Sequence, residues 1–289
     1  MSSKGKRFPR FKVALAFPAV VFLCLFFFLA GLFGSIIISQ DLTRIGSRHT
    51  SLKSLEEEKD GGAMSHGETG ESWVRSVPFQ ILSWRPRTFY FPGFATSAQC
   101  QSIIEMARSS MKPSTLALRK GETAESTKGI RTSSGTFISA ADDRTGTLDY
   151  IERKIAKATR IPKSHGEAFN ILRYEVGQRY VSHYDAFNPA EYGPQKSQRV
   201  ASFLLYLSDV EEGGETMFPY ENGLNTRMAY DYKSCMGLKI KPRQGDGLLF
   251  YSLFPNGTID KTSLHGSCPV IKGGKWVATK WIRDQVLDD

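Results

Sequence analysis

The hydrophobic pattern divides the chain of 289 residues into segments of different character. Residues 13–40 carry no formal charge and are mostly apolar. At about 1.5 Å per residue, a helix of this length exceeds a hydrocarbon core of about 30 Å. Residues 41–77 are rich in Ser, Gly and Glu, without apolar periodicity. The pattern therefore predicts a transmembrane signal anchor at 13–40, a solvated stem at 41–77 and a globular domain at 78–289.

The basic tail in front of the apolar run predicts how the chain is inserted. Residues 1–12 contain no acidic residue and five basic ones, Lys4, Lys6, Arg7, Arg10 and Lys12. Because such a cluster stays in the cytoplasm, we expect a single-pass type II protein with a lumenal stem and domain. The apolar run is longer than the roughly 7–15 residues of a cleaved signal peptide, which favours a retained anchor. The expected location is the endoplasmic reticulum membrane, with the Golgi left open.

Within residues 78–289 the apolar positions change from a helical to an extended period. Two segments show helical spacing, the first with Thr96 or Ser97 as its capping residue. Their apolar positions are Cys100, Ile103, Ile104, Ala107 and Met111 in the first, and Leu148, Ile151, Ile155 and Ala158 in the second. Runs typical of strands follow at 169–175, 200–208, 237–241, 247–254 and 275–283. This order predicts a mostly β domain with flanking helices, an antiparallel sandwich or barrel of the jelly-roll kind.

The composition adds two exclusions. The hydrophobic share of 40% and the charged share of 23% are those of an ordinary globular protein, which excludes general disorder. The net charge is +9, but residues 1–12 supply +5 of it, so the other 277 residues carry only +4. So small an excess over so long a segment does not indicate nucleic-acid binding.

Three of the five histidines lie in the predicted domain. His183 is followed two residues later by Asp185, and alternate residues of an extended chain project to the same face. This pair alone is a weak signal, because a histidine bonded to a neighbouring acid is the commoner explanation. Together with His265, from a separate region of strands, it forms the two-histidine, one-carboxylate set of non-haem Fe(II) centres. These three residues are the predicted metal ligands.

Lys275 begins the strand that follows His265. A dicarboxylate cosubstrate inside an apolar barrel needs a cationic partner, because a buried carboxylate without one costs several kcal/mol. The position of Lys275 predicts that it provides this partner. An exposed lysine at the end of a strand is the simpler alternative.

Five stretches of the domain resemble the 2-oxoglutarate-dependent prolyl 4-hydroxylases, and among them the membrane-anchored plant type. They are RTSSGTFIS at 131–139, HGEAFNILRYEVGQRYVSHYDAF at 165–187, QRVASFLLYLSDVEEGGETMFP at 198–219, GDGLLFYSLFPNGTID at 245–260 and TSLHGSCPVIKGGKWVATKWIR at 262–283. The resemblance covers about residues 78–285. It implies a double-stranded β-helix, in agreement with the jelly roll expected from the strand pattern.

The resemblance also implies roles for individual residues. The iron ligands would be His183, Asp185 and His265. Lys275 would pair with the distal carboxylate of 2-oxoglutarate, and Tyr174 and Thr216 would help to hold this cosubstrate. The peptide groove would be formed by Arg131, Glu167, Arg199 and Trp281. Core packing, or an ion pair between Glu167 and Arg199, is an equal alternative for the groove residues. Arg283 stands where we expect a histidine, so its part in the groove is open.

The implied activity is conversion of peptidyl proline to 4-hydroxyproline in proline-rich secretory glycoproteins of the cell-wall type. It is coupled to oxidative decarboxylation of 2-oxoglutarate to succinate and uses Fe(II) and O2, with ascorbate to rescue oxidised iron. Proline-rich segments form extended helices that dock in aromatic-lined grooves. Aromatic residues that would line such a groove, or pack in the barrel, are Tyr180, Tyr184, Phe187 and Tyr192. The expected partners are peptide substrates and the membrane, not nucleic acid; an oligomer with itself or related hydroxylases is left open.

Four cysteines and one sequon bear on processing. Cys24 lies in the apolar run, which leaves three cysteines in an oxidising lumen, so one must remain unpaired. Because Cys100 belongs to a helical apolar stripe, we predict a disulfide between Cys235 and Cys268. The only N-x-S/T sequon begins at Asn256 and predicts one glycan, although its Asn-Gly pair equally marks a turn.

Three other functions remain open on the sequence. One is a related 2-oxoglutarate oxygenase with another substrate, and a second is a catalytically silent jelly roll that binds peptide or glycan. The third is a zinc hydrolase, since zinc accepts the same ligand types. Lys275 argues against the hydrolase, because hydrolysis needs no partner for a dicarboxylate.

Overall fold

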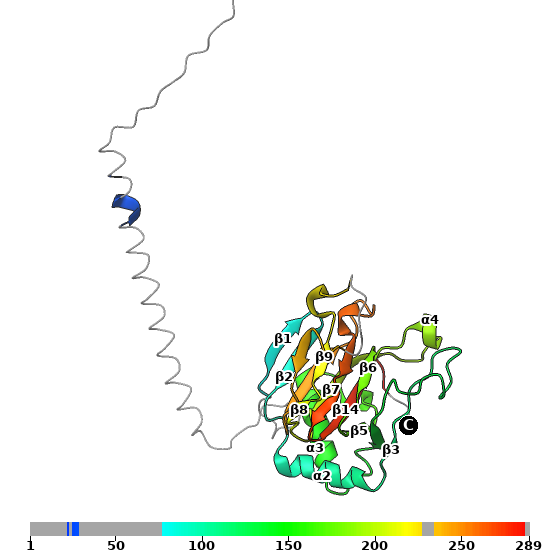
Figure 1. Cartoon of the computed structure of the whole chain (residues 1–289). Helices are drawn as coiled ribbons and strands as arrows, with labels where there is room; N and C mark the ends of the chain where they lie inside the picture. Colours follow the sequence, from blue (N-terminus) through cyan, green and yellow to red (C-terminus); the bar gives the residue numbers. More distant parts are fainter. Residues whose placement is uncertain (1–21, 23–24, 29–76, 227–233, 287–289) are drawn as a thin grey trace, which may run out of the picture. The chain divides into compact units, whose positions relative to one another are not determined.

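The computed structural model describes residues 22, 25–28, 77–226 and 234–286 (Figure 1). The chain divides into two compact units, Met1–Ala63 and Met64–Asp289. Phe22 and residues 25–28 are helical. The predicted tail, most of the predicted anchor and all of the predicted stem except Val77 lie outside the described residues. Within the described ranges, no helix has both the length and the apolar character needed to cross a membrane.

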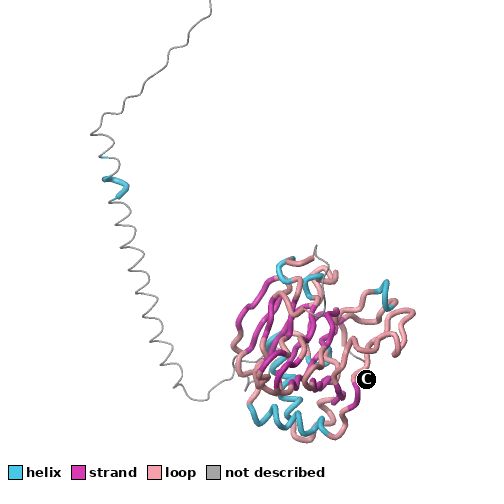
Figure 2. The backbone as a smooth tube through the Cα atoms, viewed as in Figure 1, coloured by secondary structure: helices cyan, strands magenta, loops and turns pink. Residues whose placement is uncertain are grey.

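The second unit is built on an antiparallel sheet of eight strands. In spatial order these are β1 (Gln80–Trp84), β2 (Arg87–Phe91), β11 (Gly247–Tyr251), β7 (Arg199–Tyr206), β14 (Lys275–Arg283), β5 (Phe169–Tyr174), β4 (Ser134–Ile138) and β3 (Lys112–Pro113). A four-stranded sheet contains β10 (Leu238–Ile240), β9 (Thr216–Phe218), β12 (His265–Ser267) and β6 (Tyr180–His183), and a two-stranded one β13 (Val270–Lys272) and β8 (Glu212–Gly213). Figure 2 shows the strands, in magenta, together in the body of the domain.

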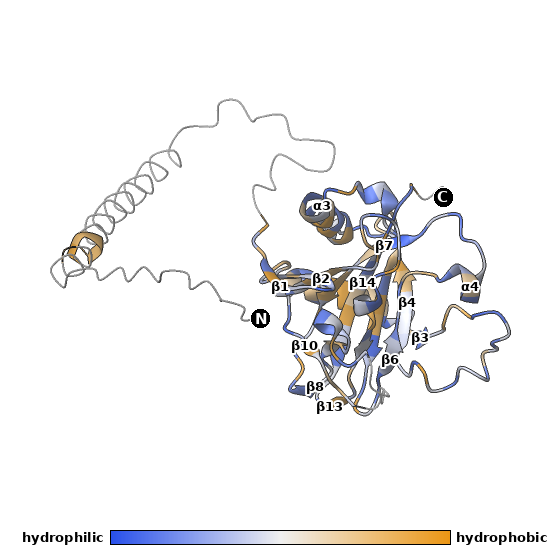
Figure 3. Cartoon of the chain, turned by 90° about the horizontal axis from the view of Figure 1, so that it is seen from above, coloured by the Kyte–Doolittle hydropathy of each residue, from blue (hydrophilic) through white to orange (hydrophobic). Residues whose placement is uncertain are grey.

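A buried apolar cluster lies between the eight-stranded and the four-stranded sheet. The large sheet contributes Leu172, Leu204 and Phe250, and the small sheet contributes Phe218 and Ile240. Residues of two sheets share one cluster when the sheets pack face to face. The domain is therefore a mostly β sandwich of the jelly-roll kind, as the sequence predicts. In Figure 3 the apolar colour concentrates in the strands at the centre of the domain.

Two helices cover the opposite face of the large sheet. α2 (Ser97–Arg108) buries the predicted positions that lie within it, and α3 (Thr147–Thr159) buries those that the spacing marks except Ala158, which is only partly buried. Cys100 of α2 and Ile151 of α3 lie in one apolar cluster with Phe203 of β7. The large sheet is thus apolar on both faces, with a helical layer on one and the small sheet on the other.

The start of α2 follows from local capping chemistry. The Thr96 hydroxyl accepts a hydrogen bond from the Gln99 N–H, and the Gln99 side chain accepts one from the Thr96 N–H. This reciprocal capping box selects Thr96 from the two capping residues expected. Met111, which shares the helical spacing, lies beyond the end of the helix and packs on the same core from the following segment.

The predicted strand runs coincide with β5, β7, β10, β11 and β14, with ends that differ by at most three residues. The other strands are not predicted. The expected order of helices before strands is wrong for β1, β2 and β4, which precede α2 or α3, and the three or four residues of β6, β9 and β12 show too little alternation to be recognised. The remaining short elements are α4 (Pro189–Tyr192), η1 (Lys163–His165), η2 (Glu221–Gly223) and η3 (Lys261–Ser263).

Strand alternation decides which residues of β14 face the interior of the sandwich. Lys275, Val277, Thr279 and Trp281 line one inner cavity. Residues of the alternate set, such as Ala278 and Ile282, belong to the apolar layer under the helices. Because successive side chains of a strand point to opposite faces, one strand supplies both the core and the cavity wall.

Cys235 and Cys268 are joined by a disulfide, the pair that the sequence predicts, and Cys100 is a buried free thiol. The disulfide attaches the segment before β10 to the residue that follows β12. Since β12 begins at His265, the bond also restrains the strand that carries this histidine.

Replacing Cys235 by serine should lower the free energy of unfolding by about 3–4 kcal/mol, because the disulfide restricts an unfolded-state loop between residues separated by 33 positions. Urea denaturation with and without reductant measures this loss. Reductant should move the wild-type midpoint to that of the variant and leave the variant unchanged. A wild-type midpoint that reductant does not move would contradict the prediction.

Candidate active site

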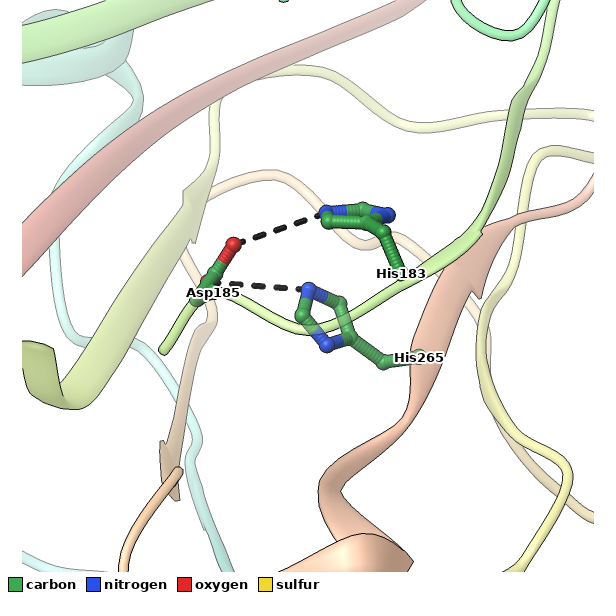
Figure 4. Close-up of side chains that lie close together, drawn as sticks. All are labelled: His183, Asp185 and His265. Carbon is green, nitrogen blue, oxygen red and sulfur yellow. Dashed lines mark ion pairs between the residues drawn. The ribbon is translucent and has the colours of Figure 1, made fainter. Parts of the chain in front are cut away.

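Strand pairing holds His183 and His265 opposite each other. β6 and β12 are antiparallel, and in their register His265 lies across from His183, with ring centroids 4.4 Å apart. Asp185 lies in a bend after β6, so the expectation that it shares an extended strand with His183 is wrong. Its carboxylate nevertheless points toward both rings (Figure 4), 3.5 Å from His183 Nε2 and 3.6 Å from His265 Nε2. The structure thus brings the three residues together.

Backbone hydrogen bonds set the orientation of both imidazoles. His183 Nδ1 lies 2.9 Å from the carbonyl of Val181, and His265 Nδ1 lies 2.9 Å from that of Ser263. A carbonyl only accepts, so each Nδ1 carries the hydrogen and each Nε2 keeps its lone pair. Both lone pairs are therefore available to one metal ion.

Aromatic packing keeps the two rings in place. Tyr180 stacks on His183 with centroids 3.7 Å apart and an interplanar angle of 21°. Phe250 packs against His265 at 4.4 Å. Ser202 donates a hydrogen bond to Asp185 Oδ2. Neighbouring groups therefore hold all three side chains before any ligand binds, which is the support that metal ligands usually require.

The charges of the three residues suit a divalent metal. Burial lowers the pKa of His265 to about 4, so this ring is neutral at physiological pH. Burial alone would raise the pKa of Asp185, but the adjacent His265 and His183 bring it below its ordinary value. Two imidazoles that direct Nε2 inward and one carboxylate, with ligand atoms within 4.8 Å of one another, fit the facial triad of Fe(II).

Lys275 lies in the inner cavity with the three candidate ligands. It is only 1% exposed, and its Nζ donates a hydrogen bond of 2.8 Å to the Ser267 hydroxyl. Burial lowers its pKa to about 7, against the opposing charge of Glu215, and its hydrogen bond goes to a neutral acceptor. A buried ammonium with a neutral acceptor suits the carboxylate of an entering ligand. The alternative of an exposed lysine at the strand end is wrong.

The other two residues expected at the cosubstrate site line the same cavity. The Tyr174 ring centroid is 5.3 Å from Lys275 Nζ. Thr216 accepts a hydrogen bond of 2.8 Å from the Tyr206 hydroxyl, which leaves the Thr216 hydrogen for another acceptor. These donors around Lys275 fit a dicarboxylate such as 2-oxoglutarate.

A groove with a cavity volume of about 680 Å³ adjoins the metal centre. His183 and Asp185 line both the groove and the inner cavity. The aromatic residues predicted for a groove all lie along it, namely Tyr180, Tyr184, Phe187 and Tyr192. Of the predicted groove residues, Arg131, Arg199 and Trp281 line it, and Glu167 lies behind Arg199. The space next to the metal centre therefore has room for an extended chain.

The ion pair offered as an alternative for Arg199 and Glu167 is present beside the groove. Arg199 Nε and Nη2 each donate a 2.7 Å hydrogen bond to the Glu167 carboxylate. Arg283 Nε donates to the same carboxylate at 2.6 Å. The ion pair and the groove position are thus compatible, because Arg199 forms the wall of the groove while Glu167 anchors it.

Several residues of the site escape prediction from the sequence. Ser267, two residues after His265 on β12, has the same strand-alternation signal that was applied to His183, and that signal would have found it. Tyr206 of β7 reaches Thr216 of β9 only because the large and the small sheet pack face to face, and Phe137 joins Trp281 in the groove wall from β4. The sequence holds no local signal for these two.

Comparison with known proteins agrees with this geometry. Residues 169–283 match the 2OG-Fe(II) oxygenase superfamily. Probable prolyl 4-hydroxylase 9 of Arabidopsis thaliana is 66% identical over 99% of both chains, and prolyl 4-hydroxylase 13 is 56% identical over 95% of this chain and 97% of that one. The solved structure of a collagen prolyl hydroxylase from Paramecium Bursaria Chlorella virus-1 is 28% identical, with a TM-score of 0.49, and covers 68% of this chain and 95% of that chain.

The fold and the metal centre define an oxygenase that uses Fe(II), 2-oxoglutarate and O2. Within this class the chain belongs to the plant prolyl 4-hydroxylase family, since it matches those relatives over nearly their whole length. It is an enzyme of the procollagen-proline 4-dioxygenase type.

Proposed function

We propose that this chain hydroxylates C4 of proline residues in proline-rich secretory glycoproteins of the cell-wall type. The observation that carries the proposal is the groove, which runs into the metal centre at His183 and Asp185. Its aromatic lining, which includes Tyr180, Phe187 and Tyr192, is the kind of surface against which extended proline-rich segments dock. The proposal includes the roles of the metal ligands and of the residues that bind 2-oxoglutarate, given below.

Different residues of the site would bind the metal and the cosubstrate. His183, Asp185 and His265 would hold the metal, and Lys275 would receive the distal carboxylate of 2-oxoglutarate, beside the hydroxyl of Thr216. When bound, Fe(II) with 2-oxoglutarate and O2 supplies the oxidising chemistry and the release of succinate. The contribution of the chain is to position the two substrates and to exclude water from the space between them.

The groove suits a proline-rich ligand. Such segments form an extended left-handed helix with unbonded carbonyl groups and dock against aromatic side chains. Trp281 and Phe137, with ring centroids 6.3 Å apart, present an aromatic wall. The buried indole N–H of Trp281 has no hydrogen-bond partner among the described residues.

Incubation of a poly-proline or extensin-like peptide with the enzyme, Fe(II), 2-oxoglutarate and ascorbate tests the proposal. Mass spectrometry of the peptide should show a gain of about 16 Da on proline, with one succinate per hydroxyl group when the two reactions are coupled. Omission of 2-oxoglutarate is the control and should give no gain. Succinate without modified proline would contradict the proposed substrate class.

The sequence further supports a proposal for the location. The basic tail and the uncharged run at 13–40 favour a type II signal anchor in the endoplasmic reticulum membrane, with the domain in the lumen. Asn256 lies on an exposed loop, in a position that an oligosaccharide can reach. Protection of the domain from added protease in intact microsomes, and a mobility shift after glycosidase treatment, would test the two points.

A further inference from the structure

The carboxylate of Glu167 is shared by two guanidinium groups, Arg199 and Arg283. The three side chains are only 14–17% exposed. Burial alone would raise the pKa of Glu167, but its bonds to Arg199 and the charge of both arginines bring it below its ordinary value. Glu167 is therefore ionised, and the cluster of one acid and two bases keeps a net charge of +1.

Arg199 presents this excess charge to the groove. Its guanidinium lies 3.6 Å from the ring centroid of Trp281 and 4.9 Å from that of Phe187. Both rings line the groove, as Arg199 itself does. Nε and Nη2 bond to Glu167, and Nη1 has no partner among the described residues. Arg199 is thus held rigidly with one pair of N–H donors left for a ligand.

A second cation, Arg131, lies where the groove meets the inner cavity. Its guanidinium carbon is 4.7 Å from the ring centroid of Tyr180, which stacks on His183. Its hydrogen bonds go to neutral acceptors, the Ser133 hydroxyl at 3.3 Å and the Thr115 carbonyl at 3.5 Å. Within the described residues no carboxylate pairs with Arg131, so its charge is also uncompensated.

The other charged groups of the groove leave its net charge positive. Arg119 pairs with Glu122 and Glu191, and Lys112 is exposed without an ion pair in the described part of the chain. Asp185 is committed to the metal centre. A groove with a net positive charge attracts acidic ligands and repels basic ones.

We propose that the enzyme selects acidic proline-rich segments, in which Asp or Glu flanks the target proline and its carboxylate bonds to Arg131 or Arg199. This selectivity rests on the proposed function and adds to it a substrate class. Arg283 sets the strength of the selection without touching the peptide, because it supplies the charge that Glu167 cannot cancel.

Three peptides of one proline-rich sequence, with Glu, Gln or Lys beside the target proline, test the selectivity. Hydroxylation of the Glu peptide should have a kcat/KM about tenfold above that of the Gln peptide, and the Gln peptide should exceed the Lys peptide by a similar factor. The difference should lie mainly in KM and should shrink in about 0.5 M salt, since salt screens charges. Equal kcat/KM for all three peptides overturns the inference while the proposed function stands. If none is hydroxylated, both fail.

Variants of Arg283 identify the source of the selectivity. Arg283→Met should reduce the ratio of kcat/KM between Glu and Lys peptides about tenfold, and Arg283→Lys, which keeps the charge, should preserve it. Lys272→Met is the matched control, because Lys272 is an exposed residue of β13 paired with Glu211 outside the groove. A ratio that survives in a folded Arg283→Met protein, as judged by thermal melting, overturns the assignment to this cluster.

Discussion

Replacement of His183 by alanine should reduce succinate formation by at least about a thousandfold, because a metal ion in such a site supplies several kcal/mol of stabilisation to the reaction. The same variant should lose Fe(II) on desalting, since one of the three ligands is gone. Metal content after anaerobic reconstitution measures the second effect independently of turnover. The two results together separate a lost ligand from a lost catalytic step.

His165→Ala is the matched control for metal binding. His165 is the only other histidine of the described residues, and its Nδ1 lies 3.0 Å from the carbonyl of Arg283, away from the metal centre. This variant should retain Fe(II) like the wild type. Retention of Fe(II) by His183→Ala, or its loss from His165→Ala, would show that the triad is wrongly assigned.

Replacement of Lys275 by alanine should weaken 2-oxoglutarate binding by about a hundredfold to a thousandfold, because removal of one partner from a buried ion pair typically costs 3–5 kcal/mol. The lost partner is an ammonium only 1% exposed. Fe(II) binding should stay near the wild-type value, since Lys275 holds no metal. Calorimetric titration of the anaerobic Fe(II) protein with 2-oxoglutarate measures the change.

Ser267→Ala removes the only hydrogen-bond acceptor that the described residues provide for Lys275 Nζ. This smaller change should weaken 2-oxoglutarate about tenfold, because a hydrogen bond to a charged group is worth roughly 1.5–3 kcal/mol. Binding of 2-oxobutanoate, which lacks the distal carboxylate, should be unaffected in both variants. If both ligands weakened equally, Lys275 would not be the partner of the distal carboxylate.

The pH dependence of 2-oxoglutarate binding follows from the same lysine. Burial lowers the pKa of Lys275 to about 7 in the free site, and only the protonated form attracts a carboxylate. Affinity should therefore be constant below this pH and fall as the pH rises above it, by up to about tenfold per unit. Lys275→Ala should lose this dependence. An identical pH profile in the variant would exclude Lys275 as the titrating group.

The helices and the long strands could be predicted from the sequence because their signals are local. The apolar stripe of α3 and the alternation along β14 lie within a dozen residues, and both elements form where the pattern places them. The residue types of the site are local signals as well. The short strands are different, since β6 and β12 exist only because each pairs with the other.

What the sequence by itself determined is the chemistry available and the place of β14 along the chain, a strand on which successive side chains alternate between two faces. Only the tertiary structure decided that His265 lies across from His183 and that Arg283 reaches Glu167, 116 positions away in the chain. Strand alternation depends on backbone geometry, which every residue carries locally. Strand register and shared ion pairs depend instead on contacts between distant segments, whose gain must exceed the entropy of closing the loops between them.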